Sequence, residues 1–378
     1  MAENKEPNTL RELLAELNAQ GITDHRRYEQ VRRFLNFKAR EKGVPISGCF
    51  ELTPLCNLDC KMCYVHLNRE QMKGAQLLSV EQWKSIMQQA VDAGMMYARL
   101  TGGECLTYPG FKELYLFLRE RGVEVTILSN GLLMNEEMTG FLRENPPAKV
   151  QVTLYGASGD AYERVTGRRA FETVAANLHR LKAADIPLAV TVTPNAFMAD
   201  GEQILRWLHE NSFPYQINSG LMSPRKETGR GKVDAALDTY VTLMKLQGEQ
   251  RGWEITPEPE PAGLPEPGGT AHSVSKGVRC GAGRSDFSVD WRGGMRPCNT
   301  FPCEAVSIKA LGFMGAWKQV NDIANGFVLP QECEGCTYKV GCKHCVAEHA
   351  SGAEIGHANP AICAWRIRLH IEGIIKQP

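Results

Sequence analysis

Short runs of β-branched and apolar residues alternate along the chain with longer segments whose apolar positions recur at helical spacing. The runs predict six strands, near residues 49–53, 96–101, 123–129, 150–155, 188–194 and 215–220. The segments between them predict helices near residues 80–93, 110–121, 135–144, 170–184 and 201–211. Strands that alternate with helices indicate a parallel sheet covered by helices. We therefore expect an α/β fold in which six βα units form a partial (β/α)6 TIM-like barrel, with the catalytic groups at the carboxyl ends of the strands.

The segments outside this barrel have other patterns. Residues 9–42 have helical spacing and predict a pair of packing helices, with docking of a peptide leader as the functional alternative. A basic loop at 223–232, where an acidic peptide could dock, precedes a helix predicted at 234–251. Residues 256–269 are rich in Pro, Glu and Gly, which predicts an extended spacer. The predicted domains are a helical segment at 1–44, the barrel at 45–222, a bridging segment at 223–269 and a cysteine-rich domain at 270–378.

Composition and charge narrow the classes of partner. The 43 Lys and Arg residues balance 43 Asp and Glu residues, which removes any global attraction to nucleic acid or to an anionic membrane. No apolar run is long enough to span a bilayer, and the polar first residues lack the features of a signal peptide. We therefore place the protein in the cytoplasm, where its 13 cysteines are expected to be thiols or metal ligands.

Three cysteines follow the first predicted strand at close spacing. Cys56, Cys60 and Cys63 form a C-x3-C-x2-C pattern. Thiolates favour zinc or iron-sulfur clusters. A structural zinc ion takes four ligands, whereas this loop supplies three cysteines. A cubane cluster on three cysteines leaves one iron open to a substrate or cofactor, so the loop favours a [4Fe-4S] cluster.

This loop resembles the signature of radical S-adenosylmethionine (SAM) enzymes. In that family the reduced cluster cleaves SAM to methionine and a 5'-deoxyadenosyl radical, which abstracts hydrogen from an unactivated carbon. The residue before the third cysteine is usually aromatic in the family. Here Met62 stands in that place and Tyr64 follows the cysteine, so Tyr64 is the candidate cofactor contact.

A second motif, Gly102-Gly103-Glu104, ends the second predicted strand. Glycines let the backbone approach a ligand closely, and a carboxylate accepts hydrogen bonds from an ammonium group. The segment resembles the family motif that holds the amino group of SAM. Cys105 follows where the family commonly has proline. It is expected to be a small buried filler or, alternatively, a thiol hydrogen donor.

Three later strand ends supply further candidates. Ser129 and Asn130 resemble a family position that contacts ribose or carboxylate oxygens, and their alternative role is to cap the next helix. After the fourth strand, the stretch with Arg164 and Arg168 resembles the segment in which an arginine meets the methionine carboxylate. Either arginine fits, and a surface ion pair is expected for the other. Thr193 ends the fifth strand as a candidate wall for adenine.

Eight of the 13 cysteines lie in the last hundred residues. They are Cys280, Cys298, Cys303, Cys333, Cys336, Cys342, Cys345 and Cys363. The first two bracket a hairpin predicted around Gly293 and Gly294, which would bring both thiols to one site. Four of the later ones are spaced C-x2-C-x5-C-x2-C. Zinc ribbons are the structural alternative for such paired cysteines.

This pattern resembles the SPASM extension of radical SAM enzymes, which normally carries two auxiliary [4Fe-4S] clusters. The resemblance assigns one auxiliary cluster to Cys333, Cys336, Cys342 and Cys363. It assigns the other to Cys280, Cys298 and Cys345, which are one ligand short. Cys303 could supply the fourth ligand, or the iron could stay open to bind substrate. The implied cofactors are SAM and three [4Fe-4S] clusters.

The resemblance covers about residues 45–370 and implies a radical SAM oxidoreductase. Relatives with this extension mostly modify peptides. We therefore expect oxidative modification of a ribosomally synthesised precursor peptide, by a crosslink, thioether or ring, with a reductant such as flavodoxin or ferredoxin. Alternatives are a peptide epimerase, a formylglycine-forming sulfatase maturase, a dehydrogenase of a small molecule, and a non-catalytic iron-sulfur carrier.

Overall fold

A computed structural model describes residues 9–218, 224–229, 231, 236–253, 277–278, 280–333, 336, 338, 342, 345–350 and 357–374. The spacer predicted at 256–269 lies outside the described residues, as do the last residues of the strand predicted at 215–220.

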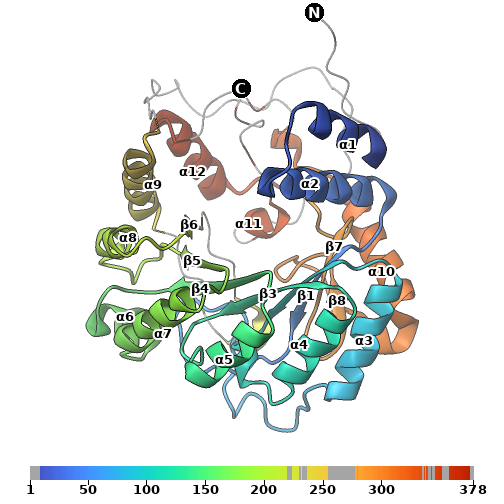
Figure 1. Ribbon diagram of the computed structural model, residues 1–378, viewed down its shortest axis with the longest axis horizontal. Helices are drawn as coiled ribbons and strands as arrows, with labels where there is room; N and C mark the ends of the chain where they lie inside the picture. The colour runs from blue at the N-terminus through green and yellow to red at the C-terminus, as the bar shows by residue number, and fades with distance from the viewer. Residues whose placement is uncertain are drawn as a thin grey trace, which may run out of the picture.

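All six strands expected from the sequence are present in one nine-stranded sheet (Figure 1). The strands are β1 (Ser47–Glu51), β2 (Tyr97–Thr101), β3 (Glu124–Ser129), β4 (Lys149–Leu154), β5 (Leu188–Val192), β6 (Tyr215–Ile217), β7 (Asp286–Val289), β8 (Gly294–Arg296) and β9 (Val306–Ser307). Their order is β6-β5-β4-β3-β2-β1-β7-β8-β9. Every pair from β6 to β7 is parallel, so the carboxyl ends of β1 to β6 meet at one edge. This is the partial (β/α)6 barrel predicted from the sequence.

Helices connect the parallel strands and cover the outer face of the sheet (Figure 1). They are α3 (Val80–Asp92), α4 (Phe111–Glu120), α5 (Glu136–Glu144), α6 (Gly159–Thr166), α7 (Phe171–Ala183) and α8 (Gly201–Glu210). Five of them match predicted helices. The short helix α6 was not predicted, although Ser158 caps its start and Gly167, at φ 71°, ends it.

The remaining helices lie before or after the barrel. They are α1 (Leu10–Ala19), α2 (His25–Lys42), α9 (Leu237–Arg251), α10 (Ile308–Gly326), α11 (Val346–Ala350) and α12 (Pro360–Ile371). The predicted N-terminal pair and the helix predicted at 234–251 are therefore present. Leu13 and Leu17 of α1 are buried, as packing helices require. Among the described residues, no helix is both long enough and apolar enough to cross a membrane.

The predicted hairpin extends the barrel sheet. β7 lies beside β1 in parallel, and β7 and β8 form the expected antiparallel pair with Gly293 in the turn at φ 81°. The ring of Phe50 on β1 packs edge-on against Phe287 on β7, with 5.8 Å between ring centroids, and Phe287 contacts Phe313 on α10. The core is therefore continuous across the boundary predicted at residue 270.

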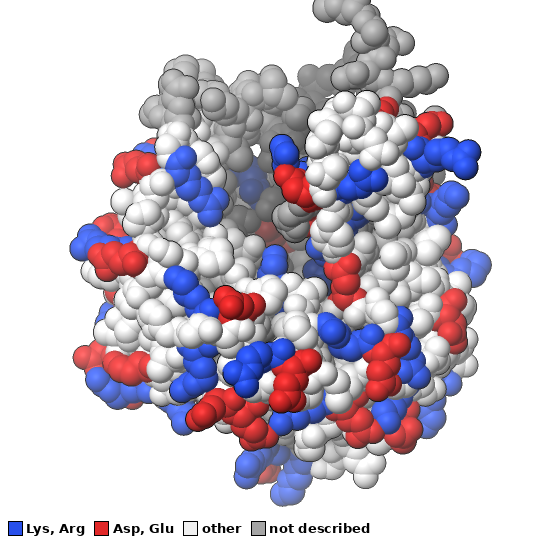
Figure 2. Space-filling view, viewed as in Figure 1, with Lys and Arg blue, Asp and Glu red and all other residues white. Residues whose placement is uncertain are grey.

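The surface agrees with the balanced charge. On the face seen in Figure 2, Lys and Arg side chains are interspersed with Asp and Glu over the helices of the barrel. Many of these charges form exposed ion pairs, such as Lys318 with Asp322 at 2.7 Å. Exposed pairs of this kind contribute less than about 1 kcal/mol to stability.

Candidate active site

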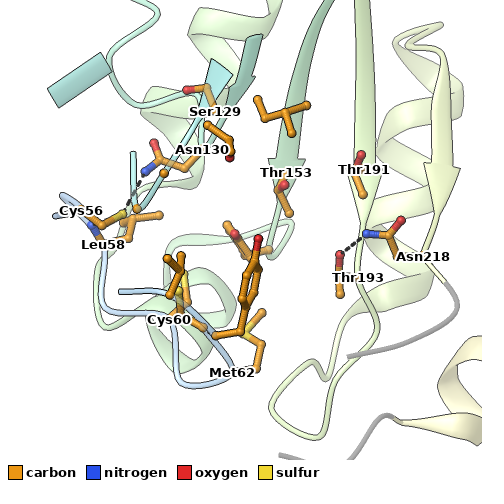
Figure 3. Close-up of a pocket in the computed structure, with 18 of the residues that line it drawn as sticks. Cys56, Leu58, Cys60, Met62, Ser129, Asn130, Thr153, Thr191, Thr193 and Asn218 are labelled. Atoms are coloured by element: carbon orange, nitrogen blue, oxygen red, sulfur yellow. Dashed lines mark hydrogen bonds between the residues drawn. The ribbon is translucent and has the colours of Figure 1, made fainter. Parts of the chain in front are cut away.

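A cavity of about 490 Å³ lies at the carboxyl ends of the parallel strands. Small-molecule sites commonly have volumes of about 300–1,000 Å³. Its lining residues include Cys56, Leu58, Cys60, Met62, Cys63, Tyr64, Gly102, Gly103, Ser129, Asn130, Gln151, Thr153, Tyr155, Thr191, Thr193, Asn218 and Glu348. Figure 3 shows Cys56 and Cys60 on one wall, and Thr193 and Asn218, joined by a hydrogen bond of 3.1 Å, on the opposite wall. The structure thus brings most of the predicted cofactor-binding residues to one cavity.

The cysteine loop is held by the end of helix α6. The backbone N–H groups of Asp59 and Lys61 donate to the carbonyl oxygens of Thr166 and Val165, each at 3.0 Å. These carbonyls belong to the last turn of α6, where helix carbonyls need partners outside the helix. The unpredicted helix therefore anchors the loop that carries the three thiols.

The loop backbone also points donors at its own sulfur atoms. The N–H of Leu58 lies 3.4 Å from Cys56 Sγ, and the N–H of His66 lies 3.3 Å from Cys63 Sγ. Burial raises the pKa of the Cys56 thiol to about 12. Metal binding displaces the thiol proton, so donors aimed at sulfur support the thiolate that a metal requires.

The two glycines after β2 allow close contact with the cysteine loop. A Cβ atom on Gly102 would lie 2.4 Å from the carbonyl oxygen of Thr53, and one on Gly103 would lie 2.3 Å from that of Leu55. The N–H of Glu104 donates to this same Leu55 oxygen at 2.9 Å. The sequence pattern suggested close approach to a ligand. In the structure both glycines line the cavity, and because they have no side chain, the backbone of Thr53 and Leu55 packs directly against them.

Replacement of Gly103 by alanine is therefore expected to displace the cysteine loop. We expect the free energy of unfolding to fall by about 1–3 kcal/mol, because the added methyl group overlaps backbone that cannot rotate away. Chemical denaturation and the iron content after reconstitution measure the two effects. Gly140→Ala on α5 is the matched control. A Cβ atom there meets nothing within 4 Å, so stability should stay equal or rise slightly.

Glu104 joins the ends of β2 and β3. Its buried carboxylate accepts from the Ser129 hydroxyl at 3.0 and 3.1 Å, from the Asn130 N–H at 2.8 Å and from the Leu106 N–H at 3.1 Å. Burial raises the pKa of this carboxyl, and the hydrogen bonds oppose the rise. Glu104 is not among the cavity-lining residues. Its contact with the amino group of SAM stays a prediction, and its observed role is to position Ser129 and Asn130.

Asn130 links Glu104 to the cysteine loop. Its side-chain N–H group donates to Asn57 Oδ1 at 2.6 Å and lies 3.6 Å from Cys56 Sγ. Its Oδ1 accepts from the N–H of Leu132 at 3.0 Å, as expected of a local cap. Both interpretations of Asn130 are therefore compatible with the geometry.

Cys105 and the two candidate arginines lie outside the cavity lining. Cys105 is fully buried, and its thiol donates to the carbonyl oxygen of Leu128 at 3.3 Å. This geometry favours the filler over the hydrogen donor. Both arginines are exposed, and Arg168 reaches the cysteine loop, with 3.4 Å between its Nη1 and the carbonyl oxygen of Asn57. The choice between Arg164 and Arg168 stays a prediction.

The C-terminal cysteines influence one another electrostatically. Burial raises the pKa of Cys333 to about 12, and the charges of Cys363, Cys342 and Cys336 contribute to the rise. Burial also raises the pKa of Cys280, Cys303 and Cys345, and the charge of Cys298 contributes to each of these three shifts. The division of these cysteines between two clusters stays a prediction.

Cys49 was not predicted to belong to a site. This buried thiol on β1 accepts from Asn299 Nδ2 at 3.4 Å, and the charge of Cys298 contributes to its raised pKa after burial. Cys49 has no other cysteine at metal-ligand spacing in the sequence. Its surroundings therefore become visible only when β1 pairs with β7 in the structure. Asn218 and Glu348 were also missed, because neither belongs to a recognisable motif.

A buried ion pair fixes the segment that follows the barrel. Arg225 donates to both oxygens of Glu51, at 2.6 and 2.7 Å, and to the carbonyl oxygen of Asn299 at 2.7 Å. Its backbone N–H donates to the carbonyl oxygen of Tyr64 at 3.0 Å. β1, the cysteine loop and the segment after β8 thus meet at Arg225. Tyr64, the candidate cofactor contact, also lies 3.4 Å from Asn299 Nδ2.

The donor set fits an iron-sulfur cluster. Within the described part of the chain, no three His, Cys, Asp or Glu side chains are arranged around a single metal ion. In a [4Fe-4S] cluster each cysteine binds a different iron atom, so the ligands stand further apart than around one ion. Three soft thiols that line one cavity suit this group.

Comparison with known proteins agrees with this geometry. Residues 50–208 match the family model described as the radical SAM superfamily. This segment is therefore similar to radical SAM enzymes, whose cofactors are SAM and a [4Fe-4S] cluster. The cysteine-rich C-terminal region fits a SPASM extension.

Two curated relatives differ in what they cover. The sporulation killing factor maturation protein SkfB of Bacillus subtilis is 28% identical over 213 residues, which are 56% of this chain and 51% of SkfB. The AdoMet-dependent heme synthase of Methanosarcina barkeri is 23% identical, over 81% of this chain and 92% of that protein. The chain therefore spans about half the length of SkfB.

Among solved structures, Streptococcus suis SuiB bound to S-adenosylmethionine is similar over 93% of this chain and 86% of SuiB. The TM-score is 0.65 at 16% identity. A likeness at this identity concerns the fold, and it confirms the α/β architecture of the chain.

Proposed function

We propose that this protein binds SAM and a [4Fe-4S] cluster in the cavity and oxidatively modifies a ribosomally synthesised peptide. The observation that carries the proposal is that Cys56, Cys60 and Cys63 line one cavity with the polar ends of the strands. When bound, the cluster and SAM supply a radical that abstracts hydrogen from carbon. The protein supplies the thiolates, the binding surface and a site removed from bulk water.

Different residues of the cavity would bind the cluster and SAM. Cys56, Cys60 and Cys63 would hold the cluster. SAM would contact Tyr64, Gly102, Gly103, Ser129, Asn130 and Thr193, with Glu104 as the support of the strand ends and Arg168 or Arg164 as the carboxylate partner. The fork of a guanidinium suits a carboxylate, and the position of Arg168 beside the cysteine loop supports Arg168.

Two auxiliary [4Fe-4S] clusters are part of the proposal. Cys333, Cys336, Cys342 and Cys363 would bind one, and Cys280, Cys298 and Cys345 the other. Cys303 and Cys298 pack against the same small hydrophobic cluster, which supports Cys303 as the fourth ligand of the second cluster. Hydrogen abstraction followed by loss of a proton leaves one electron on the substrate, and an auxiliary cluster is a suitable acceptor. A flavodoxin or ferredoxin in the cytoplasm would deliver the electron that starts the reaction.

The relatives support a peptide substrate. SkfB is a maturation protein of a killing factor, other relatives are named PqqA peptide cyclase, and a SuiB structure contains the precursor peptide SuiA. A small-molecule substrate is the second candidate. It is favoured by the AdoMet-dependent heme synthase, which matches this chain over most of both lengths.

The test is a reaction of the reduced, cluster-reconstituted protein with SAM and the small peptide encoded beside its gene, in deuterated water. Loss of two hydrogens from the peptide, matched by deoxyadenosine, is the expected result. Deuterium uptake without oxidation would indicate an epimerase. If deoxyadenosine forms but the peptide is unchanged, the peptide hypothesis fails and a small-molecule substrate takes its place. If no deoxyadenosine forms, the result supports a non-catalytic iron-sulfur carrier.

A further inference from the structure

One acidic side chain from the C-terminal region reaches the cavity of the barrel. Glu348 lies on helix α11, which begins directly after Cys345, yet it lines the same cavity as Cys56, Cys60 and Cys63. Among the lining residues that the structure describes, Glu348 is the only Asp, Glu, Lys or Arg. The other polar groups that face the cavity are hydroxyls, side-chain amides and thiols. The position of Glu348 therefore sets the charge that a ligand meets.

Helix α12 holds this carboxylate in place. Arg366 Nη2 donates to Glu348 Oε2 at 3.2 Å, and the two side chains are 9% and 10% exposed. Asn359 Nδ2, at the start of α12, donates to the Glu348 carbonyl oxygen at 3.5 Å. On its other side α12 packs against α9, where the rings of Trp365 and Tyr240 lie 5.7 Å apart. The carboxylate is thus fixed by neighbours that do not line the cavity.

A carboxylate held in this way is suited to bind a cation. Burial of a charge is costly unless other groups compensate it, and a ligand that fills the cavity removes the remaining water. Arg366 contacts this carboxylate from the side of α12, while Glu348 also lines the cavity, so the same side chain can contact a ligand there. An ammonium or guanidinium group compensates the charge best, because hydrogen bonds between ionised groups are about twice as strong as neutral ones.

We propose that Glu348 is a specificity-determining residue that binds a cationic group of the substrate peptide, a Lys or Arg side chain or the amino terminus, with Arg366 as its positioning residue. This inference rests on the proposed function. SAM also carries positive charge. However, the groups assigned to SAM lie within residues 50–208, which match the family model, whereas Glu348 lies outside them. The peptide is therefore the partner that the structure favours.

The experiment uses the full chain with reconstituted clusters, SAM and the peptide encoded beside the gene. For Glu348→Gln we expect the Kd of the peptide to rise about 10- to 100-fold, because one charge-assisted bond is lost. The Kd of SAM and the deoxyadenosine formed without peptide should stay unchanged. Peptides in which each Lys or Arg is replaced by Gln, or in which the amino terminus is acetylated, identify the cation. The peptide that lacks this cation should bind both proteins equally.

Two further variants make the result specific. Glu348→Asp keeps the charge on a shorter side chain, so its loss of affinity should be smaller. Asp322→Asn removes an exposed carboxylate on α10 and should leave peptide binding unchanged. Iron content and circular dichroism establish that each variant is folded and loaded.

Three results would overturn the inference. The first is an unchanged peptide Kd in Glu348→Gln while the wild-type protein modifies the peptide, which would leave the proposed function intact. The second is a raised Kd for SAM, which would assign Glu348 to the cofactor. The third is a wild-type protein that neither binds nor modifies the peptide, which would overturn the proposed function together with the inference.

Discussion

Replacement of Cys56 by alanine is expected to abolish SAM cleavage. Cys56 lines the cavity with the other two thiols of the loop, and a cluster that loses one of three cysteine ligands loses both affinity and its open-iron geometry. Loss of a partner one shell further out already costs about 10- to 100-fold in metal affinity or activity, and loss of a direct ligand should cost more. Deoxyadenosine formation under dithionite measures activity. Iron analysis should show a loss of about four atoms per chain.

Cys105→Ala is the matched control for this prediction. Cys105 follows the glycine motif but is buried outside the cavity lining, so SAM cleavage and iron content should stay close to wild type. Equal losses in the two variants would contradict the assignment of the cluster to the loop. Loss of deuterium transfer to the peptide in Cys105→Ala alone would instead restore Cys105 as a hydrogen donor.

Replacement of Arg225 by alanine is expected to lower the free energy of unfolding by about 3–5 kcal/mol, because it leaves a buried carboxylate without its partner. The Glu51 side chain is 2% exposed, and Arg225 contacts both of its oxygens. Cluster loading should fall as well, since the Arg225 guanidinium also lies over the ring of Tyr64 in the cysteine loop, 5.7 Å from the ring centroid. Urea denaturation of the anaerobic protein measures the first effect, and iron analysis measures the second.

The loss in Arg225→Ala should depend on pH. Burial already raises the pKa of Glu51, and removal of the opposing guanidinium charge raises it further. An acid whose pKa is raised in the folded state binds more protons when folded than when unfolded, so stability falls as pH rises. The destabilisation should therefore grow from about pH 4.3, the ordinary pKa of Glu, up to the raised pKa in the variant. A constant loss across this range would contradict the assignment.

Two comparisons separate charge from packing in this prediction. Lys318→Ala removes an exposed pair and should cost less than about 1 kcal/mol. The double variant Glu51→Leu with Arg225→Met replaces both charges by apolar groups and should recover much of the loss, because no unpaired charge remains. A double variant as unstable as Arg225→Ala would show that shape, and not charge, is what the site requires.

The positions of the main elements followed from the sequence. Alternation of apolar runs and helical periods located β1 to β6 and the five longer helices between them, since β1 to β5 contain buried residues and each helix buries one face. The spacing of Cys56, Cys60 and Cys63 and the glycine motif after β2 located the cavity. These features are local, because residues that share a loop or a strand end are already close in the chain.

Other features could be recognised only in the folded protein. Helix α6 is too short for its period to be distinctive, yet it anchors the cysteine loop. The sequence did not indicate that β7 would pair with β1, a contact that makes the core continuous across residue 270. Hydrogen bonding between strands depends on backbone edges, which carry no side-chain pattern.

The roles of individual polar residues also depended partly on the sequence and partly on the tertiary structure. The sequence by itself determined the class of chemistry, because thiols at a fixed spacing are specific for a cluster and strand ends are the usual place for a site. Only the tertiary structure decided that Glu104 bonds the strand ends, that Cys105 is buried outside the cavity lining, and that Glu348 enters the cavity from α11. Each of these outcomes depends on which distant groups surround a side chain, and burial and charge compensation are properties of that surrounding.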